Sequence, residues 1–150
     1  MATPNTTFVS GAILTATQQN NLAWGTVGNA TKSADQNVTT LADVSGLSVA
    51  FTAVASRVYL VTVMLNLYSA AGASCGVYLT DGTTTFQESI GTIAAGYQQT
   101  RSFSTYVTGL TAGSKTLKIQ ADASASTTIY GTSIRASLAA KMTVIDIGAA

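Results

Sequence analysis

The sequence predicts an all-β protein, a jelly-roll-like antiparallel β-sandwich that follows an N-terminal anchoring segment of extended chain and short helix. Charged residues make up only 9% of the chain, against about 25% in typical soluble domains. Apolar and polar residues alternate with period two from about residue 35 onward, which is typical of half-buried strands. Turn residues divide this region into eight or nine short runs, as in sandwiches and jelly rolls. A length of 150 residues fits one domain, which we divide into residues 1–34 and 35–150.

Residues 1–34 differ in composition from the remainder. They hold the only Pro and the only Trp, and they are rich in Asn, Gln, Thr and Gly. Thr15 and Gln18 have the spacing of a capping box, in which each side chain satisfies a backbone N–H. This predicts a short helix over about 16–22, too short to be stable alone. Its apolar side chains must therefore dock on the domain or on a partner, and the candidate anchor residues are Leu14, Leu22 and Trp24.

The run 57–69 is apolar on both faces of a predicted strand. One face carries Tyr59, Val61, Val63, Leu65 and Leu67. The other face is largely apolar too, and its candidate self-association residues are Val58, Leu60 and Met64. A strand that is apolar on both faces is covered on both faces. Because a two-layer sandwich leaves one face to solvent, we expect a second copy of the chain to cover it.

Other strands follow from alternation and turn residues. Residues 47–51 alternate as a half-buried strand. Asp81 and Gly82 separate the runs 77–79 and 86–88, which predicts a hairpin with a type I′ turn. Further strands are predicted over three runs: 98–107, 115–121 and 133–147.

Catalytic and metal chemistry have little support in the composition. The chain has no His, which excludes a Ser-His-Asp triad and a His-ligated metal. The single cysteine, Cys75, lies in a strand-like run and is expected to be a buried hydrophobe. We therefore expect no catalytic, cofactor-binding or metal site. Two alternatives are a calcium site at Asp81 and Asp122 with loop carbonyls, and a glycosidase-like pair among the six dispersed acids.

The pattern of charge and hydropathy limits the partners. The seven basic residues are scattered, so no nucleic-acid footprint is expected. The longest apolar run is far shorter than the roughly 20 residues that cross a bilayer, and the N-terminus lacks the features of a signal peptide. We expect synthesis in a cytoplasm and no membrane insertion.

Several aromatic residues allow a sugar-binding interpretation. Tyr97 follows Ala94, Ala95 and Gly96 in a predicted loop, which makes it the candidate glycan contact. The ordinary alternative is that a Tyr in a sheet packs its ring and exposes its hydroxyl to water. The other aromatics weighed for this role are Trp24, Tyr68, Tyr106 and Tyr130.

Three stretches resemble a known group of proteins. Residues 7–16, with 19–22 and 24–25, resemble the N-terminal opening of many tailed-bacteriophage virion proteins, including minor tail and capsid-surface proteins of actinobacterial phages. Residues 46–53 and 57–61 resemble the opening of the β-sandwich in that group, and 110–119 resemble its turn into a late strand.

The resemblance implies a virion component that is often trimeric, and it supplies no catalytic residues. The expected function is a non-enzymatic capsid decoration protein on the virion surface. Its expected partners are other copies of itself, as a homotrimer, and the major capsid protein or another virion protein. The alternative is a minor tail or receptor-binding protein that recognises a host-surface glycan.

Overall fold

The computed structural model describes residues 22–132 and 136–149. Strands and one 3-10 helix, η1, make up its regular structure. In chain order, the elements are β1 (Gly25–Thr31), β2 (Gln36–Val38), β3 (Ala42–Ala53), β4 (Arg57–Ser69), β5 (Ala73–Thr80), β6 (Thr85–Ile93), β7 (Tyr97–Val107), β8 (Gly113–Ala123), β9 (Thr127–Ile129), η1 (Ala136–Leu138) and β10 (Lys141–Ala149).

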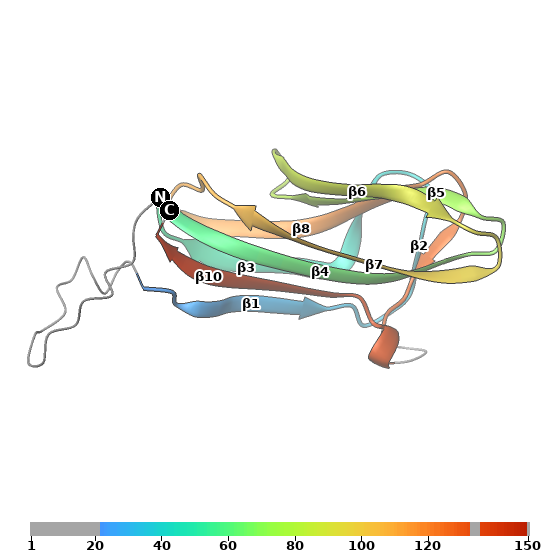
Figure 1. Ribbon diagram of the computed structural model, residues 1–150, viewed down its shortest axis with the longest axis horizontal. Helices are drawn as coiled ribbons and strands as arrows, with labels where there is room; N and C mark the ends of the chain where they lie inside the picture. Colours follow the sequence, from blue (N-terminus) through green and yellow to red (C-terminus); the bar gives the residue numbers. More distant parts are fainter. Residues whose placement is uncertain (1–21, 133–135, 150) are drawn as a thin grey trace, which may run out of the picture.

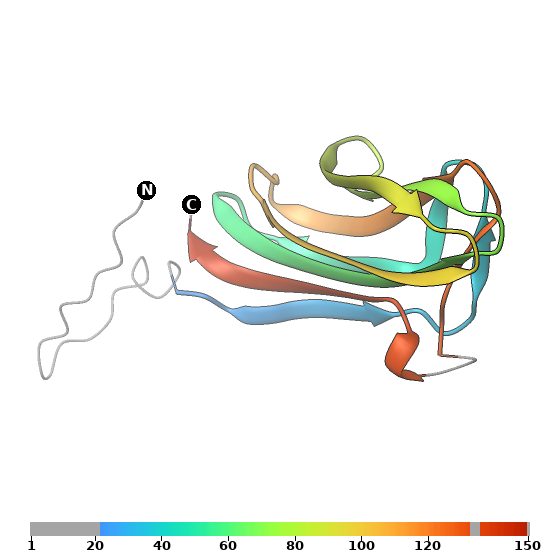
Figure 2. The ribbon, with the colours of Figure 1, turned by 45° about the vertical axis from the view of Figure 1, so that its right-hand side comes forward.

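These strands form two antiparallel sheets, stacked as two layers (Figure 1). The β4 sheet has the order β1-β10-β4-β7; the short β9 pairs with the last residues of β4, past the region that pairs with β10, and β2 pairs with β9. The β8 sheet has the order β3-β8-β5-β6. In Figure 2, β1 (blue) and the turn between β5 and β6 (yellow-green) lie on opposite sides of the body. Apart from the β5–β6 hairpin, the long strands alternate between the sheets, which gives a jelly roll. The predicted fold class is confirmed.

The core lies between the sheets and follows from the alternation along β4. The predicted inner residues of β4 are each at most 3% exposed: Tyr59, Val61, Val63, Leu65 and Leu67. The β8 sheet faces them with fully buried side chains, including Val77, Leu117 and Ile119. Successive residues of a strand point to opposite faces, so this burial leaves the even-numbered residues of β4 on the outer face.

The hairpin between β5 and β6 is confirmed, but the predicted type I′ turn is wrong. Thr80 pairs with Thr85, so the loop spans residues 81–84. Gly82 has φ +95°, whereas Asp81 has no positive φ. Oδ1 of Asp81 accepts hydrogen bonds from the N–H groups of Thr83 and Thr84 at 2.9 and 2.7 Å. An Asp side chain that satisfies its own turn stabilises a longer loop, and these bonds lower the pKa of Asp81.

The predicted strand over 133–147 is wrong over residues 136–140. Residues 133–135 lie outside the described residues, η1 follows, and β10 begins at Lys141. Nδ2 of Asn66, which is buried in β4, donates a hydrogen bond to the carbonyl of Leu138 at 2.8 Å. This bond gives a buried amide a partner outside the ladder, which an alternation pattern does not reveal.

The N-terminal part of the description begins at Leu22. Leu14 and most of the predicted short helix lie outside the described residues. Residues 25–31, assigned from sequence to the anchoring segment, form β1 and pair with β10. The register shifts between Thr26 and Gly28, and such a bulge disrupts the period-two signal. A Cβ at Gly28 would lie 2.3 Å from Cγ1 of Val49, so glycine allows β1 to approach β3.

Candidate interaction surfaces

The outer face of the β4 sheet brings the predicted self-association residues together. Leu60 pairs with Ile145 of β10 on one side and with Tyr106 of β7 on the other. Directly paired residues point to the same face of a sheet, so these three side chains form one apolar row, which we call the outer row. Tyr106 is 66% exposed, and Leu60 and Ile145 are half-buried. Val58 lies beside the row on β4, also half-buried.

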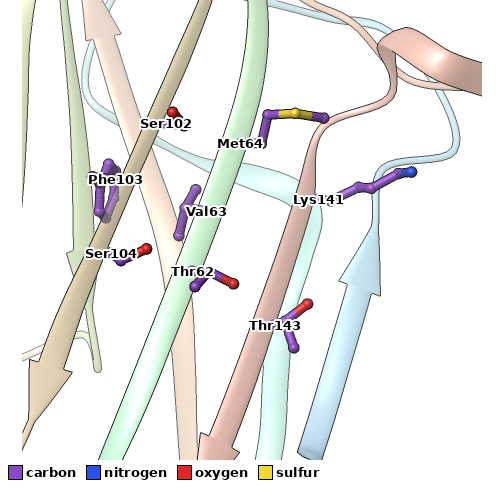
Figure 3. Close-up of a pocket in the computed structure, with 8 residues that line it drawn as sticks. All are labelled: Thr62, Val63, Met64, Ser102, Phe103, Ser104, Lys141 and Thr143. Carbon is purple, nitrogen blue, oxygen red and sulfur yellow. The ribbon is translucent and has the colours of Figure 1, made fainter.

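A shallow groove continues along the same face (Figure 3). Its volume is about 510 Å³, and its floor includes Thr62 and Met64 of β4. Met64 pairs with Lys141 of β10 and with Ser102 of β7. The face therefore changes from apolar at the outer row to hydroxyl-rich and basic at Met64. Val58, Leu60 and Met64 share one face, as the sequence predicts.

Two of the predicted anchor residues lie at a buried ion pair. Nε and Nη2 of Arg57 donate to the carboxylate of Asp146 at 2.5 Å, and both side chains are almost fully buried. Nη2 also donates to the carbonyl of Leu22. The guanidinium lies 4.4 Å from the ring centroid of Trp24, a cation–π contact. Arg57 therefore fixes the chain at the residues that precede β1.

The side chains of the two anchor residues remain accessible. Leu22 is 49% exposed and Trp24 is 55% exposed. An exposed Trp beside an exposed Leu is available for contact with a partner. The roles of both residues, and of Leu14, stay predictions.

Sequence reasoning missed the Arg57–Asp146 pair. The two residues lie 89 positions apart, so no local pattern joins them. One signal was present: Asp146 places a charge between Ile145 and Ile147 in a strongly apolar strand. Charged residues are almost never fully buried without a partner, so the position of Asp146 implies a buried basic partner on another strand.

Tyr97 does not lie in a loop but is the first residue of β7. It pairs with Ser69 at the end of β4 and is 70% exposed. The ring is therefore available to a ligand, and the glycan role stays a prediction.

The carboxylates of Asp43 and Asp122 also have partners within the fold. Asp43 accepts hydrogen bonds from Lys118 and Gln120, both at 2.8 Å, and these bonds lower its pKa. Asp122 accepts from the N–H of Gly76 at 3.0 Å and from the hydroxyl of Tyr78 at 3.3 Å. Burial and the neighbouring Asp122 raise the pKa of Tyr78.

The calcium alternative places its two acids far apart. Asp122 pairs with Gly76, five residues along β5 from Asp81, or roughly 16 Å at strand spacing. Across the described residues, no group of three or more His, Cys, Asp or Glu side chains gathers to hold a metal ion. Cys75 is buried, as predicted, and burial raises the pKa of its thiol. Nor do residues 22–132 and 136–149 contain a helix of the length and hydropathy that would cross a membrane.

No family model matches this chain, and no curated protein matches it. Among solved structures, Eiger TNF from S. frugiperda superposes with a TM-score of 0.54 at 10% identity, over 84% of this chain and 95% of that chain. This likeness shows a shared fold, so the molecule belongs to the class of all-β jelly-roll proteins.

Two viral particle structures align less closely. The infectious bursal disease virus Gx strain has a TM-score of 0.45 at 11% identity, over 81% of this chain and 38% of that chain. The T13 particle of the same virus has a TM-score of 0.42 at 10% identity, over 81% and 35%. The chain thus spans less than two fifths of those viral chains.

Proposed function

We propose that this protein is a non-enzymatic structural protein of a virion, a capsid decoration protein that self-associates and attaches to the head through its N-terminal segment. The observation that carries the proposal is the outer row of Leu60, Tyr106 and Ile145. Three neighbouring strands present apolar side chains to solvent at one level. Patches of this kind mark protein–protein contacts on soluble proteins. The virion context rests on the resemblance to phage virion proteins of residues 7–16, 19–22, 24–25, 46–53, 57–61 and 110–119.

The proposed oligomer is a homotrimer in which the outer face of the β4 sheet is covered by another copy. Leu60 lies in the middle of the outer row, between Ile145 and Tyr106, with Val58 and Met64 on the same strand face. The hydroxyl-rich groove around Thr62 would form the polar part of the contact. Interfaces of stable complexes combine an apolar centre with a polar rim, and this face has both.

The proposed attachment uses the chain that precedes β1. Arg57 holds the Leu22 carbonyl and the Trp24 ring against the body. The side chains of Leu22 and Trp24 are about half exposed, so this junction presents apolar surface to the proposed partner, the major capsid protein or another virion protein. Aromatic side chains are frequent anchors at such interfaces.

Binding to capsids that lack this protein tests the attachment. We expect deletion of residues 1–21 to abolish loading and Trp24→Ala to weaken it by about tenfold or more. Deletion beyond residue 24 is avoided because it would remove part of β1. Leu41→Ala is the matched control, since Leu41 is 59% exposed but lies beside the β8 sheet. Unchanged loading by both the deletion and Trp24→Ala would contradict the attachment proposal.

A second candidate is a minor tail or receptor-binding protein that recognises a host-surface glycan. The observation that favours it is the 70% exposure of Tyr97 at the start of β7. The two candidates differ in copy number: a decoration protein is present in hundreds of copies per particle, whereas a receptor-binding tail protein is present in few. Quantitative mass spectrometry of purified virions distinguishes them, and binding of the isolated protein to host cells would favour the second.

A further inference from the structure

A polar groove opens between the free edges of the two sheets. It has a volume of about 370 Å³ and is formed by Ser89–Thr92 of β6 and Gln99–Ser102 of β7. β6 is the last strand of the β8 sheet, and β7 is the last strand of the β4 sheet. The groove is therefore separate from both the outer row and the anchor residues.

A buried arginine forms part of the lining of this groove. Arg101 pairs with Leu65, so its side chain points inward between the sheets, and it is only 8% exposed. Its hydrogen bonds are long: Nη1 donates to the Ser89 carbonyl at 3.4 Å and Nη2 to Oε1 of Gln99 at 3.5 Å. Nε has no hydrogen-bond partner. A guanidinium in this position has its donors poorly satisfied.

Arg101 also lacks a charged partner within the described part of the chain. The ion pairs found there join Arg57 to Asp146 and Lys118 to Asp43. A buried charge is costly unless it is paired and fully hydrogen-bonded. The position therefore lacks the usual explanation for a buried arginine, which is a structural salt bridge.

The neighbouring strand leaves space for the guanidinium. A Cβ built at Gly91 of β6 would lie 2.7 Å from Nη2 and 3.1 Å from Nη1 of Arg101. Any other residue at this position would displace the guanidinium. Glycine weakens a strand interior, so Gly91 lowers the stability of β6 locally while it leaves room for the guanidinium of Arg101.

The lining favours one class of ligand. A guanidinium binds carboxylates through two parallel hydrogen bonds. Arg101 is the only charged residue among those that line the groove, so a single negative charge is matched better than a phosphate dianion or a polyanion. On the inward-facing side that Arg101 occupies, the other polar side chains of the lining are the hydroxyl of Ser89 and the amide of Gln99. These groups match the hydroxyls of a sugar ring.

We propose that the groove between β6 and β7 is a binding site for an acidic sugar, with Arg101 pairing its carboxylate and the hydroxyl and amide side chains holding its ring hydroxyls. Tyr97 has the same parity on β7 as Gln99 and Arg101, so it lies on the groove side of that strand. Its exposed ring provides a stacking surface for a neighbouring sugar unit. The inference does not depend on the decoration proposal, because Arg101, Gly91 and Tyr97 have no role in that proposal, and it gives a site and a ligand class for the glycan of the second candidate function.

Calorimetric titration of the full chain tests the site with D-glucuronate as the probe. D-glucose controls for the hydroxyls, acetate for the carboxylate alone and phosphate for a general anion site. We expect saturable binding of glucuronate and affinities at least about tenfold weaker for the other three ligands. Equal binding of glucose, acetate or phosphate, or no binding of glucuronate, would overturn the proposal.

Two variants locate the binding. Arg101→Met replaces the buried charge with an apolar side chain, so it should fold with unchanged or higher thermal stability and lose at least about tenfold in glucuronate affinity. Gly91→Ala should also weaken binding, because its Cβ displaces the guanidinium. Lys115→Met is the control, since Lys115 bonds to Thr111 away from the groove. Wild-type affinity in folded Arg101→Met or Gly91→Ala would overturn the proposal.

Discussion

The two sheets have similar inner faces and different outer faces. On the outer face of the β8 sheet, β3 and β8 carry small or polar residues, such as Ser48, Ala50 and Thr116, with a Lys118–Asp43 ion pair across the two strands, whereas the edge strand β6 exposes Ile90. The equivalent face of the β4 sheet carries Leu60, Tyr106 and Ile145 in one row. Both faces belong to strands that alternate with period two. Burial of the inner faces therefore explains the fold of both sheets. Whether an outer face contacts solvent or a partner depends on the residues that it exposes.

The largest expected effect concerns the two ion pairs, one on each sheet. Asp146→Ala leaves the Arg57 guanidinium buried without its carboxylate, so the free energy of unfolding should fall by about 3–5 kcal/mol. Denaturant unfolding at a fixed protein concentration measures it.

The matched control on the β8 sheet is Asp43→Ala. Its side chain is 54% exposed, and exposed pairs contribute about 1 kcal/mol or less. Because Lys118 and Gln120 lower the pKa of Asp43 below 3.8, its contribution is present above that pH and disappears as the pH falls through the folded-state pKa. A larger loss for Asp43→Ala than for Asp146→Ala would reverse the comparison.

The next effect concerns self-association. Leu60→Arg places a charge at the centre of the outer row, and we expect the dissociation constant to rise by at least about tenfold. Ala50→Arg is the control, because Ala50 is exposed on the β8 sheet. Sedimentation equilibrium measures both, and an equal effect of the two substitutions would refute the assignment of the interface to the β4 sheet.

The smallest effect concerns Lys32, which joins the two sheets. It is 1% exposed, and Nζ donates to Gln36 and to the Ser45 carbonyl and hydroxyl at 2.9–3.0 Å. Desolvation lowers its pKa below 10.5. The unfolded chain therefore binds more protons between the folded-state pKa and 10.5, so the free energy of unfolding should rise with pH over that interval.

Lys32→Met should remove this alkaline rise. Thermal unfolding of the wild type and the variant at pH values approaching 10.5 measures the difference. An identical pH dependence in both proteins would show that Lys32 does not titrate as its burial implies.

Strand positions were predictable because burial on one face leaves a period-two signal. The run 57–69 matches β4 at both ends, since both its faces are apolar. Elements defined by side chains that satisfy backbone groups were less predictable. Asp81 caps its own four-residue turn, and Asn66 bonds to the Leu138 carbonyl beside η1. Such bonds depend on single residues rather than on a pattern.

The candidate surfaces were predictable to different degrees. Val58, Leu60 and Met64 followed from the second apolar face of one strand. Ile145 and Tyr106 were absent from that prediction because their place beside Leu60 depends on the register of three strands distant in sequence. Arg101 gave no signal either, since a lone arginine in an alternating run indicates an exposed position until the topology places it between two sheets.

The most direct test of the central claim is oxidative footprinting of two tyrosines with similar exposure in one subunit. Tyr106 is 66% exposed in the outer row, and Tyr97 is 70% exposed at the start of the same strand. Mass spectrometry would compare their hydroxyl-radical oxidation in the self-associated wild type and in the Leu60→Arg protein. We predict that oxidation of Tyr106 is lower in the wild type and that oxidation of Tyr97 is the same in both. Equal oxidation of Tyr106 in both, or protection of Tyr97 alone, would contradict the account.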